Sequence, residues 1–422
     1  VGRIPAQTTE EAEACISKII AYEAAPSAQW KKNFLFISGG FDFLEQNQFS
    51  LQSDALIKTF ILPAPTCGLA TSLHKTTSST QEGEHRQDIL DTIDAGVVWV
   101  NFIGHAGSKT WDLMFHNTDI EALSNGPQYP FITSMTCHTG RFAEPNQVAF
   151  GEHFLMVENK GAIGFMGTSG WGYSYEDYTF LSRLFPAALT DTLRALAEII
   201  DKAKVKLWEE GADNSQITNM IYQYNLLGDP ALRLGLPVAP DLAVEPGDIE
   251  VLPEIPNEAD STAQITVRIN NWGLATRDSI GVRLTVRQSN GGEQVLLPLA
   301  KRPAIGRIDS ITCNWPLRNM AGAVELIAQV DPMAAIAESD EGNNLAKRSI
   351  TVTSRRLQVN SPPPFALIPR DRLVFKVWEM DRNAAPRSVE FAVDTSQAFH
   401  SPMLQTSGRL TMNQMAVSWS PQ

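Results

Sequence analysis

The chain has 422 residues, more than a single hydrophobic core normally supports, so we expect two or three domains. Its 34 basic and 47 acidic residues give a net charge of −13, and no basic run interrupts the sequence. This balance argues against nucleic-acid and anionic-membrane partners. No apolar stretch approaches the roughly 18 to 20 residues of a membrane span, so we expect no transmembrane segment.

The chain begins with Val1 rather than methionine and stops at "SWSPQ". We therefore expect a fragment or processed piece whose first and last domains are truncated. The four cysteines are widely scattered and form no C-x-x-C pair, so neither a disulfide framework nor a paired-cysteine metal site is predicted.

Helix and strand patterns alternate through the first 236 residues. Thr8 to Glu11 has the S/T-x-x-E spacing of a helix start, followed by an apolar face of Ala12, Cys15, Ile16, Ile19 and Ile20. Strands are predicted at 33–40, 97–103, 130–137 and 161–167, and helices at 83–94 and around 193–207. Continuous apolar strands between helices predict a mostly parallel sheet with helices on both faces.

Two chemically active side chains follow buried strands of this sheet. His105 ends the run "VVWVNFIGHAG", and Cys137 ends "PFITSMTC". Both belong at the carboxyl edge of the sheet, where function collects in such folds. An imidazole beside a thiol can remove its proton and later protonate a leaving amine, and nearby backbone N–H groups can stabilise an oxyanion. A lone cysteine is more often core filler, and this is our interpretation of Cys15, Cys67 and Cys313.

Five segments resemble, in order, the blocks of the gingipain-type cysteine peptidase family. They cover roughly residues 1 to 236 and read "VGRIPAQTTEEAEACISKIIAYE", "FIGHAGSKTWD", "TCHTGRF", "GEHFLMVENKGAIGFMGTSGWG" and "YNLLGDPALRL". The resemblance implies an α/β caspase-like sandwich, with Cys137 as nucleophile and His105 as general base and acid. Their separation, 137 − 105 = 32, fits that family rather than caspases.

The sequence departs from the family pattern at two places. The G-H-G loop is Gly104, His105, Ala106 here, and alanine is costly if that position needs a positive φ. The family's third acid is replaced by Ser38 beside the glycines, so Asp42 is our candidate to orient His105, with Glu45 as the alternative. Solvated loop carboxylates remain an equal interpretation of both.

Further residues are assigned around the expected cleft. The backbone at Gly104 and Ala106 is predicted to line the oxyanion and substrate cleft, and Trp171 to cover a specificity pocket. Glu176 or Asp177 would favour a basic substrate residue, although loop packing and solvated charge are the commoner roles of such residues. We expect a last set of residues to be purely structural, namely His116, His138 and His153.

A proline-bearing linker at 234–247 precedes alternating strands from 240 to 354, the pattern of an Ig-like antiparallel β-sandwich. "VRINNWG" and "VDPMAAIAESDEGNN" resemble the CARDB domain of bacterial surface proteins. The second motif carries hard oxygen ligands that suit structural calcium, although clustered acids in a turn are more often solvated: Glu338, Asp340, Glu341, Asn343 and Asn344. No cofactor or catalytic metal is predicted. Residues 360–422 are predicted to be a partial β-rich domain.

Two functions follow from these expectations. The first is a cysteine endopeptidase, or a transpeptidase like the type IX secretion sortases of the same family, secreted or at the bacterial cell surface. It would act on protein or peptide substrates, with cell-envelope or secretion-machinery partners. The second is a catalytically silent peptidase fold that serves as an adhesion or secretion scaffold. The missing acid and Ala106 favour the scaffold, whereas His105 and Cys137 oppose it.

Overall fold

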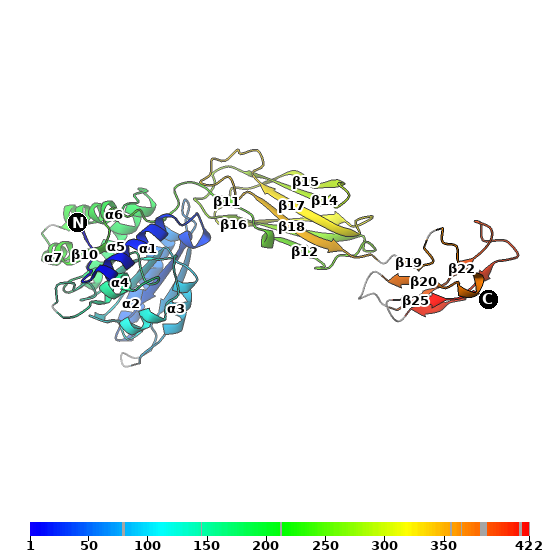
Figure 1. Cartoon of the computed structure of the whole chain (residues 1–422). Helices are drawn as coiled ribbons and strands as arrows, with labels where there is room; N and C mark the ends of the chain where they lie inside the picture. Colours follow the sequence, from blue (N-terminus) through cyan, green and yellow to red (C-terminus); the bar gives the residue numbers. More distant parts are fainter. Residues whose placement is uncertain are drawn as a thin grey trace.

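The computed structural model describes residues 1–77, 81–144, 146–211, 213–354, 357–363, 365–379, 386–412 and 416–421. Figure 1 shows three bodies in a row, an α/β body, an all-β body and a smaller β-rich body at the C-terminal end. No helix in the described ranges is long and apolar enough to cross a membrane.

The α/β body is built around a seven-stranded sheet of order β1-β10-β9-β8-β4-β2-β3. Its strands are β1 (Gly2–Arg3), β2 (Asn33–Ser38), β3 (Leu69–His74), β4 (Trp99–Ile103), β8 (Phe131–Met135), β9 (Gly164–Thr168) and β10 (Tyr224–Gly228). The five strands from β9 to β3 are mutually parallel, and β10 runs antiparallel to β9. The mostly parallel sheet predicted from the apolar runs is therefore confirmed.

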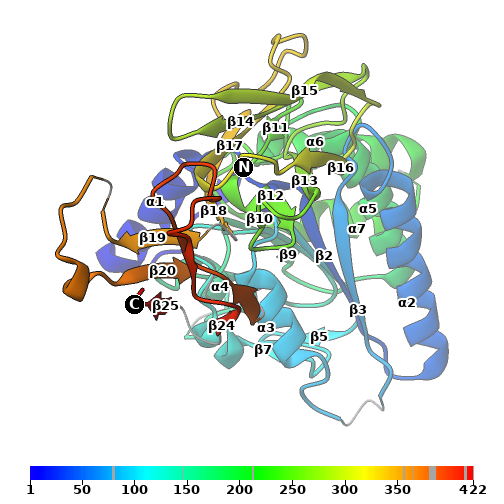
Figure 2. The same cartoon turned by 90° about the vertical axis from the view of Figure 1, so that its right-hand side faces the viewer.

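Helices cover both faces of this sheet, as Figure 2 shows from the side. They are α1 (Thr9–Glu23), α2 (Phe43–Leu56), α3 (Arg86–Asp94), α4 (Phe150–Met156), α5 (Ser174–Leu189), α6 (Leu196–Gly211) and α7 (Ser215–Gln223). Alternate residues of one strand enter two separate cores, because side chains along a strand point to opposite faces. Phe34 and Phe36 pack with α2, α5 and α6, whereas Leu35 and Ile37 pack with α3 and α4.

Helix α1 begins with the predicted capping box, in which the Thr8 side chain and Glu11 exchange hydrogen bonds with the backbone. The predicted apolar face is wrong in part, because Ile16 and Ile20 are 50% and 63% exposed. The helix instead turns Lys18 inward, where its ammonium donates to the carbonyl oxygens of Phe154 (3.2 Å) and Lys160 (3.0 Å). The buried face of the helix therefore includes Lys18, whose ammonium is satisfied by two carbonyl oxygens, whereas the predicted Ile16 and Ile20 lie outside it.

The second body is an antiparallel β-sandwich, which confirms the predicted Ig-like class. Its strands are β11 (Leu242–Ala243), β12 (Ile249–Leu252), β13 (Thr262–Asn271), β14 (Ile280–Gln288), β15 (Glu293–Arg302), β16 (Ile308–Pro316), β17 (Gly322–Val330) and β18 (Leu345–Val352). One sheet contains β11, β12, β13 and β16, and the other has the order β15-β14-β17-β18. Their inward-facing residues form one core around the buried Trp315.

The third body consists of small sheets. Its strands are β19 (Leu357–Ser361), β20 (Phe375–Glu379), β21 (Arg387–Val389), β22 (Ala392–Val393), β23 (Gln405–Thr406), β24 (Leu410–Met412) and β25 (Ala416–Trp419). The strand predicted at "LVFKVWEM" corresponds to β20, and Met380 at its end lies outside the described residues. Whether this part is an independent domain stays a prediction.

A buried lysine joins the first two bodies. Lys32 is 1% exposed, and its Nζ donates to three carbonyl oxygens of the sandwich, those of Asn271 (3.2 Å), Gly273 (2.6 Å) and Gly306 (2.9 Å). A second contact links the two bodies through their backbones, from the Ala275 N–H to the Pro65 carbonyl at 2.8 Å. The junction is therefore a specific contact between the two bodies and more than a tether.

Candidate active site

The ends of two adjacent parallel strands bring His105 and Cys137 to the same edge of the sheet. Ile103 at the end of β4 lies opposite Met135 at the end of β8, and each candidate follows its strand by two residues. Gly104 makes the sharp exit from β4 feasible, because a Cβ there would lie 3.0 Å from the Gly39 backbone. The predicted neighbourhood of the two strands is thus observed.

His105 is held on one face and on one nitrogen. Its ring stacks on Phe41 with a centroid separation of 3.9 Å and an interplanar angle of 3°. Its Nε2 lies 3.1 Å from Glu45 Oε2, so Nε2 carries the proton of the neutral ring and Nδ1 is left as the basic nitrogen. The side chain keeps 34% of its surface exposed, which leaves room for a substrate.

Glu45, and not the preferred Asp42, is the carboxylate that contacts His105. Asp42 is the N-cap of α2, where its Oδ1 accepts the N–H groups of Leu44 (2.9 Å) and Glu45 (3.0 Å). The cap starts the helix so that Glu45, one turn in, faces back over the strand end, where its Oε2 also accepts the Phe41 N–H at 2.8 Å. The assignment of Asp42 as the orienting acid is corrected accordingly, because its carboxylate is occupied by the helix terminus.

A buried ion pair supports this turn from below. Asp112 Oδ1 lies 2.8 Å from Lys75 Nζ, with side chains 1% and 0% exposed, and Asp112 Oδ2 accepts the N–H of Gly40. A Cβ at Gly39 would lie 2.1 Å from the same carboxylate, so glycine is required there. Asp112 therefore fixes the glycine turn that leads into Phe41 and Glu45.

The Cys137 thiol lies against the loop after β9. The N–H of Gly172 points at its Sγ from 3.3 Å. Burial raises the pKa of Cys137 above its ordinary value, the Gly172 N–H lowers it, and the Asp177 carboxylate raises it further. The thiol therefore needs a base, because little thiolate forms spontaneously near neutral pH. Among the described hydrogen bonds, none uses the backbone N–H of Cys137.

Ala106 occupies ordinary extended backbone. It belongs to β5 (Ala106–Gly107), which forms a hairpin with β6 (Thr110–Trp111), and its φ is not positive. The conformational cost considered for alanine after the histidine therefore does not arise. The N–H of Gly104 makes a long bond of 3.4 Å to the Met135 carbonyl, so it belongs to the sheet.

Trp171 and His138 pack against each other beside the cysteine. Their ring centroids are 4.7 Å apart at 65°, and 63% of Trp171 is exposed. The His138 N–H donates to the Gly170 carbonyl at 2.8 Å and to Thr168 Oγ1 at 2.9 Å. His138 thus anchors the loop, which agrees with a structural role, and it holds Trp171 at the rim of the site.

Asp177 is buried beneath this loop. It is 2% exposed, and the Tyr224 hydroxyl donates to its Oδ1 at 2.6 Å. Burial raises the pKa of Asp177 to about 7, against the opposing effect of the Tyr224 and Tyr173 hydrogen bonds. Its Oδ2 lies 2.9 Å from where a Cβ of Gly172 would stand, so it closely supports the segment that contacts Cys137.

Sequence reasoning overlooked Phe41, Lys75 and Asp112. Of these, only Asp112 lies in a segment that the sequence had singled out, as the last residue of "FIGHAGSKTWD". Nothing in the sequence indicates that Lys75 contacts Asp112. Within the described ranges, no three His, Cys, Asp or Glu side chains are grouped to hold a metal ion.

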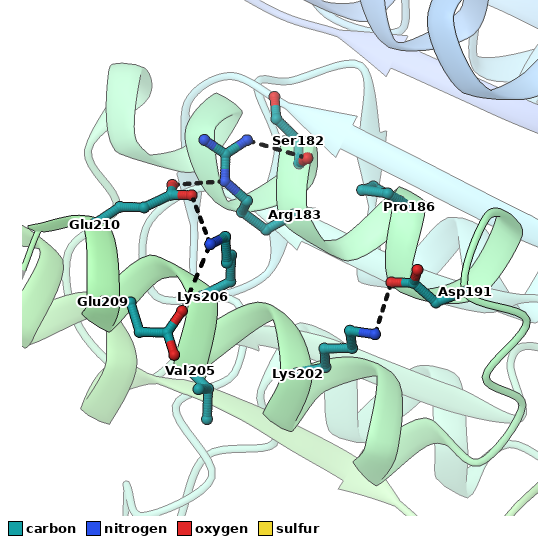
Figure 3. A pocket seen from close by; sticks show the side chains of 9 residues that line it. All are labelled: Ser182, Arg183, Pro186, Asp191, Lys202, Val205, Lys206, Glu209 and Glu210. Atoms are coloured by element: carbon teal, nitrogen blue, oxygen red, sulfur yellow. Dashed lines mark hydrogen bonds and ion pairs between the residues drawn. The ribbon is translucent and has the colours of Figure 1, made fainter.

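A groove of about 610 Å³ between α5 and α6 is lined by neither His105 nor Cys137, and Figure 3 shows its side chains. Its charged groups are already paired, Arg183 with Glu210 at 2.7 Å and Lys202 with Asp191 at 2.9 Å. Because these charges neutralise each other, we assign the groove no chemistry.

Comparisons with known proteins support the two principal bodies. The chain matches the profile of Peptidase family C25 over residues 1–235 and that of CARDB over residues 239–348. Lys-gingipain of Porphyromonas gingivalis is 33% identical over 87 residues, which is 20% of this chain and 5% of the relative. The matched stretch is thus a small part of that protein.

Solved structures give weaker likenesses. The Arg-specific cysteine proteinase gingipain R is 15% identical, with 83% of this chain and 74% of that chain covered and a TM-score of 0.48. A CARDB domain from Pyrococcus furiosus, solved in complex with di-metal ions, is 24% identical over 28% of this chain and 90% of that domain, with a TM-score of 0.23. Because the C25 profile spans more than half of the sequence, the chain belongs to Peptidase family C25.

Proposed function

We propose that the chain is an active cysteine endopeptidase that cleaves protein or peptide substrates through a thioester on Cys137. The observation that carries this proposal is the pairing of His105 with Glu45 at the edge where Cys137 emerges. A carboxylate on Nε2 fixes the tautomer whose Nδ1 accepts a proton, which is the arrangement a general base needs.

The reaction follows from these groups. His105 Nδ1 takes the proton of the Cys137 thiol, and Sγ attacks the peptide carbonyl carbon. The resulting oxyanion accepts hydrogen bonds from the N–H groups of Cys137 and Ala106. We expect the Ala106 N–H to point away from β6, because Ala106 lies next to the residue pair that closes the two-residue hairpin loop. The C–N bond then breaks as the imidazolium returns its proton to the amine, and a thioester remains.

Water completes the cycle. His105 removes a proton from a water molecule, the hydroxide attacks the thioester carbon, and the thiol is regenerated with release of the acid. An amine in place of water would give transpeptidation, the reaction of a sortase-like enzyme. Adding glycine-rich peptide amines during turnover separates the two, because only a transpeptidase incorporates them into a new amide.

The proposed setting is the bacterial cell surface or the surrounding medium, with envelope or secretion-machinery partners. Membership of family C25 and the CARDB match support this setting. Fractionation of cells expressing the full-length protein tests it, and an exclusively cytoplasmic distribution would contradict it.

Labelling of Cys137 tests the enzyme proposal. We expect an acyloxymethyl ketone to modify Cys137 far faster than Cys67, with His105→Ala slowing the reaction at least about tenfold. Mass spectrometry of the labelled peptides supplies the rates across pH. The proposal would be contradicted if Cys137 were labelled at the rate of a free thiol and this rate did not change in His105→Ala.

A silent scaffold is the second candidate. It is favoured by the raised pKa of Cys137 and by the described hydrogen bonds, none of which joins the thiol to His105. An unreactive Cys137 in the labelling experiment would favour this scaffold over the enzyme.

A further inference from the structure

Four oxygen-bearing side chains meet where the linker enters the sandwich. Asp241 immediately precedes β11, and Glu338, Asn343 and Asn344 belong to the turn between β17 and β18. Asn343 Nδ2 donates to Asp241 Oδ1 at 2.8 Å, and Asn344 Nδ2 donates to Glu338 Oε1 at 3.0 Å. The N–H of Leu242 donates to the other oxygen of Glu338, which ties the two segments together.

Three of these side chains keep a buried oxygen without any hydrogen-bond partner. The atoms are Asp241 Oδ2, Asn343 Oδ1 and Asn344 Oδ1. Asp241 is only 1% exposed and Asn344 only 8%. Burying an acceptor without a donor is destabilising, and more so when the acceptor is charged, so three such atoms in one cluster require an explanation.

Turning the amides does not remove the mismatch. If either asparagine amide were rotated by half a turn, its Oδ1 would face the carboxylate oxygen that its Nδ2 now approaches. Two acceptors would then oppose each other with no proton between them. A positive ion between the facing oxygens reconciles both orientations.

No positive side chain in the described ranges fills that place. Among the ion pairs of the described residues, none includes Asp241 or Glu338. Lys31 interacts electrostatically with Asp241, but its ammonium donates its hydrogen bond to the Ala25 carbonyl at 2.8 Å.

We propose that Asp241, Glu338, Asn343 and Asn344 bind one calcium ion at this junction. On binding, the two amides turn so that their Oδ1 atoms join Asp241 Oδ2 and the Glu338 carboxylate, and water completes the shell of six to eight oxygens typical of Ca²⁺. The set holds no nitrogen or sulfur ligand, which disfavours Zn²⁺, and its mixed irregular oxygens suit Ca²⁺ better than Mg²⁺.

The proposal changes the ligands expected from the sequence. Asp340 accepts the Gly342 N–H at 2.8 Å, and Glu341 accepts the Glu338 N–H at 3.3 Å. Both acids are exposed, so both are left out. Asp241 enters from a distant linker, and its carbonyl also accepts the Trp272 N–H at 2.8 Å. The ion would thus tie the linker to the end of the sandwich that contacts Lys32.

Calorimetric titration of the full chain, first stripped with EDTA, provides the test. We expect wild type to bind Ca²⁺ with a Kd of about 10⁻⁴ to 10⁻³ M, and Asp241→Asn to bind one ion fewer per chain. The matched control Asp340→Asn should bind as wild type does. Calcium should also raise the unfolding midpoint of wild type and of the control by more than that of Asp241→Asn.

Two results would overturn the site. One is a wild type that binds no Ca²⁺ up to about 10 mM, well above the affinity of extracellular modules. The other is an Asp241→Asn chain that binds as many ions as wild type. Asn344→Asp keeps an oxygen at its position and should retain binding. This second variant tests the site even if Asp241→Asn fails to fold. Peptidase activity is not used, so failure of the proposed enzyme function leaves this test intact.

Discussion

Glu45 and Asp42 stand three residues apart on α2, yet the structure gives them separate tasks. Only Glu45 contacts His105, at 3.1 Å, whereas Asp42 caps the helix. We therefore expect Glu45→Gln to lower kcat/KM at least about tenfold, because the amide no longer stabilises the imidazolium. Steady-state kinetics on a peptide substrate selected from a library measure kcat/KM for both chains.

The control for this prediction is Asp42→Ala. Losing the cap should lower the free energy of unfolding by about 1 kcal/mol while leaving kcat/KM within about threefold of wild type. Equal losses of activity in both variants would mean that helix placement, and not the Glu45 carboxylate, governs His105.

Asp177 makes stability depend on pH. Its pKa is raised from 3.8 to about 7 in the folded chain, so the folded state retains a proton that the unfolded state releases. This contribution is complete below about pH 4 and is lost as pH rises to about 7, with an upper size of roughly 4 kcal/mol. Denaturant titrations from pH 4 to 8 should show a flatter profile for Asp177→Asn, which keeps an acceptor for Tyr224. Parallel profiles would contradict the assignment.

At the scale of elements, the Lys75–Asp112 pair joins β3, the glycine turn after β2 and the hairpin that follows His105. Both side chains are fully enclosed, so removing one charge leaves the other buried and unpaired. Asp112→Asn should cost about 3–5 kcal/mol in urea unfolding. The exposed pair Lys202–Asp191, at 2.9 Å, is the matched control, and Asp191→Asn should cost less than about 1 kcal/mol. Similar costs would show that enclosure is not decisive.

The sequence was informative about elements because their signals are local. Apolar runs predicted β2, β4, β8 and β9, and the spacing from Thr8 to Glu11 predicted the cap of α1. The buried face of α1 was mispredicted because Lys18 finds two carbonyl acceptors on α4 and the loop beyond it, which no periodicity in α1 encodes.

For the whole molecule, the three hydrogen bonds from Lys32 to the sandwich predict that the α/β body and the sandwich unfold together. Replacing Lys32 with methionine leaves three carbonyl oxygens without their donor and should cost about 3 kcal/mol. Calorimetry should then resolve two transitions where wild type shows one. Lys31→Met is the control, because Lys31 bonds Ala25 within its own body. A single transition in Lys32→Met would show that other contacts suffice.

The candidate site was foreseeable only where strand topology decides it. His105 and Cys137 follow neighbouring strands, and this could be inferred from two apolar runs and the family blocks. The contact between Glu45 and His105 spans 60 residues, and that between Lys32 and Asn271 spans 239. Such pairings depend on how a helix or a second domain docks, which single-sequence patterns do not specify. Asp42 was preferred for its nearness to the glycines, a measure that ignores the helix terminus it has to cap.

The stacking of His105 on Phe41 has a consequence for catalysis. In the proposed mechanism, the imidazole that has taken the thiol proton is a cation lying 3.9 Å above an aromatic face, and a cation–π attraction then favours the charged ring. Phe41 is itself 53% exposed, so a bound peptide that covers it would strip water from the pair and strengthen the attraction. The ring that supports His105 is therefore also a surface that a substrate can cover, so Phe41 would link peptide binding to the proton transfer.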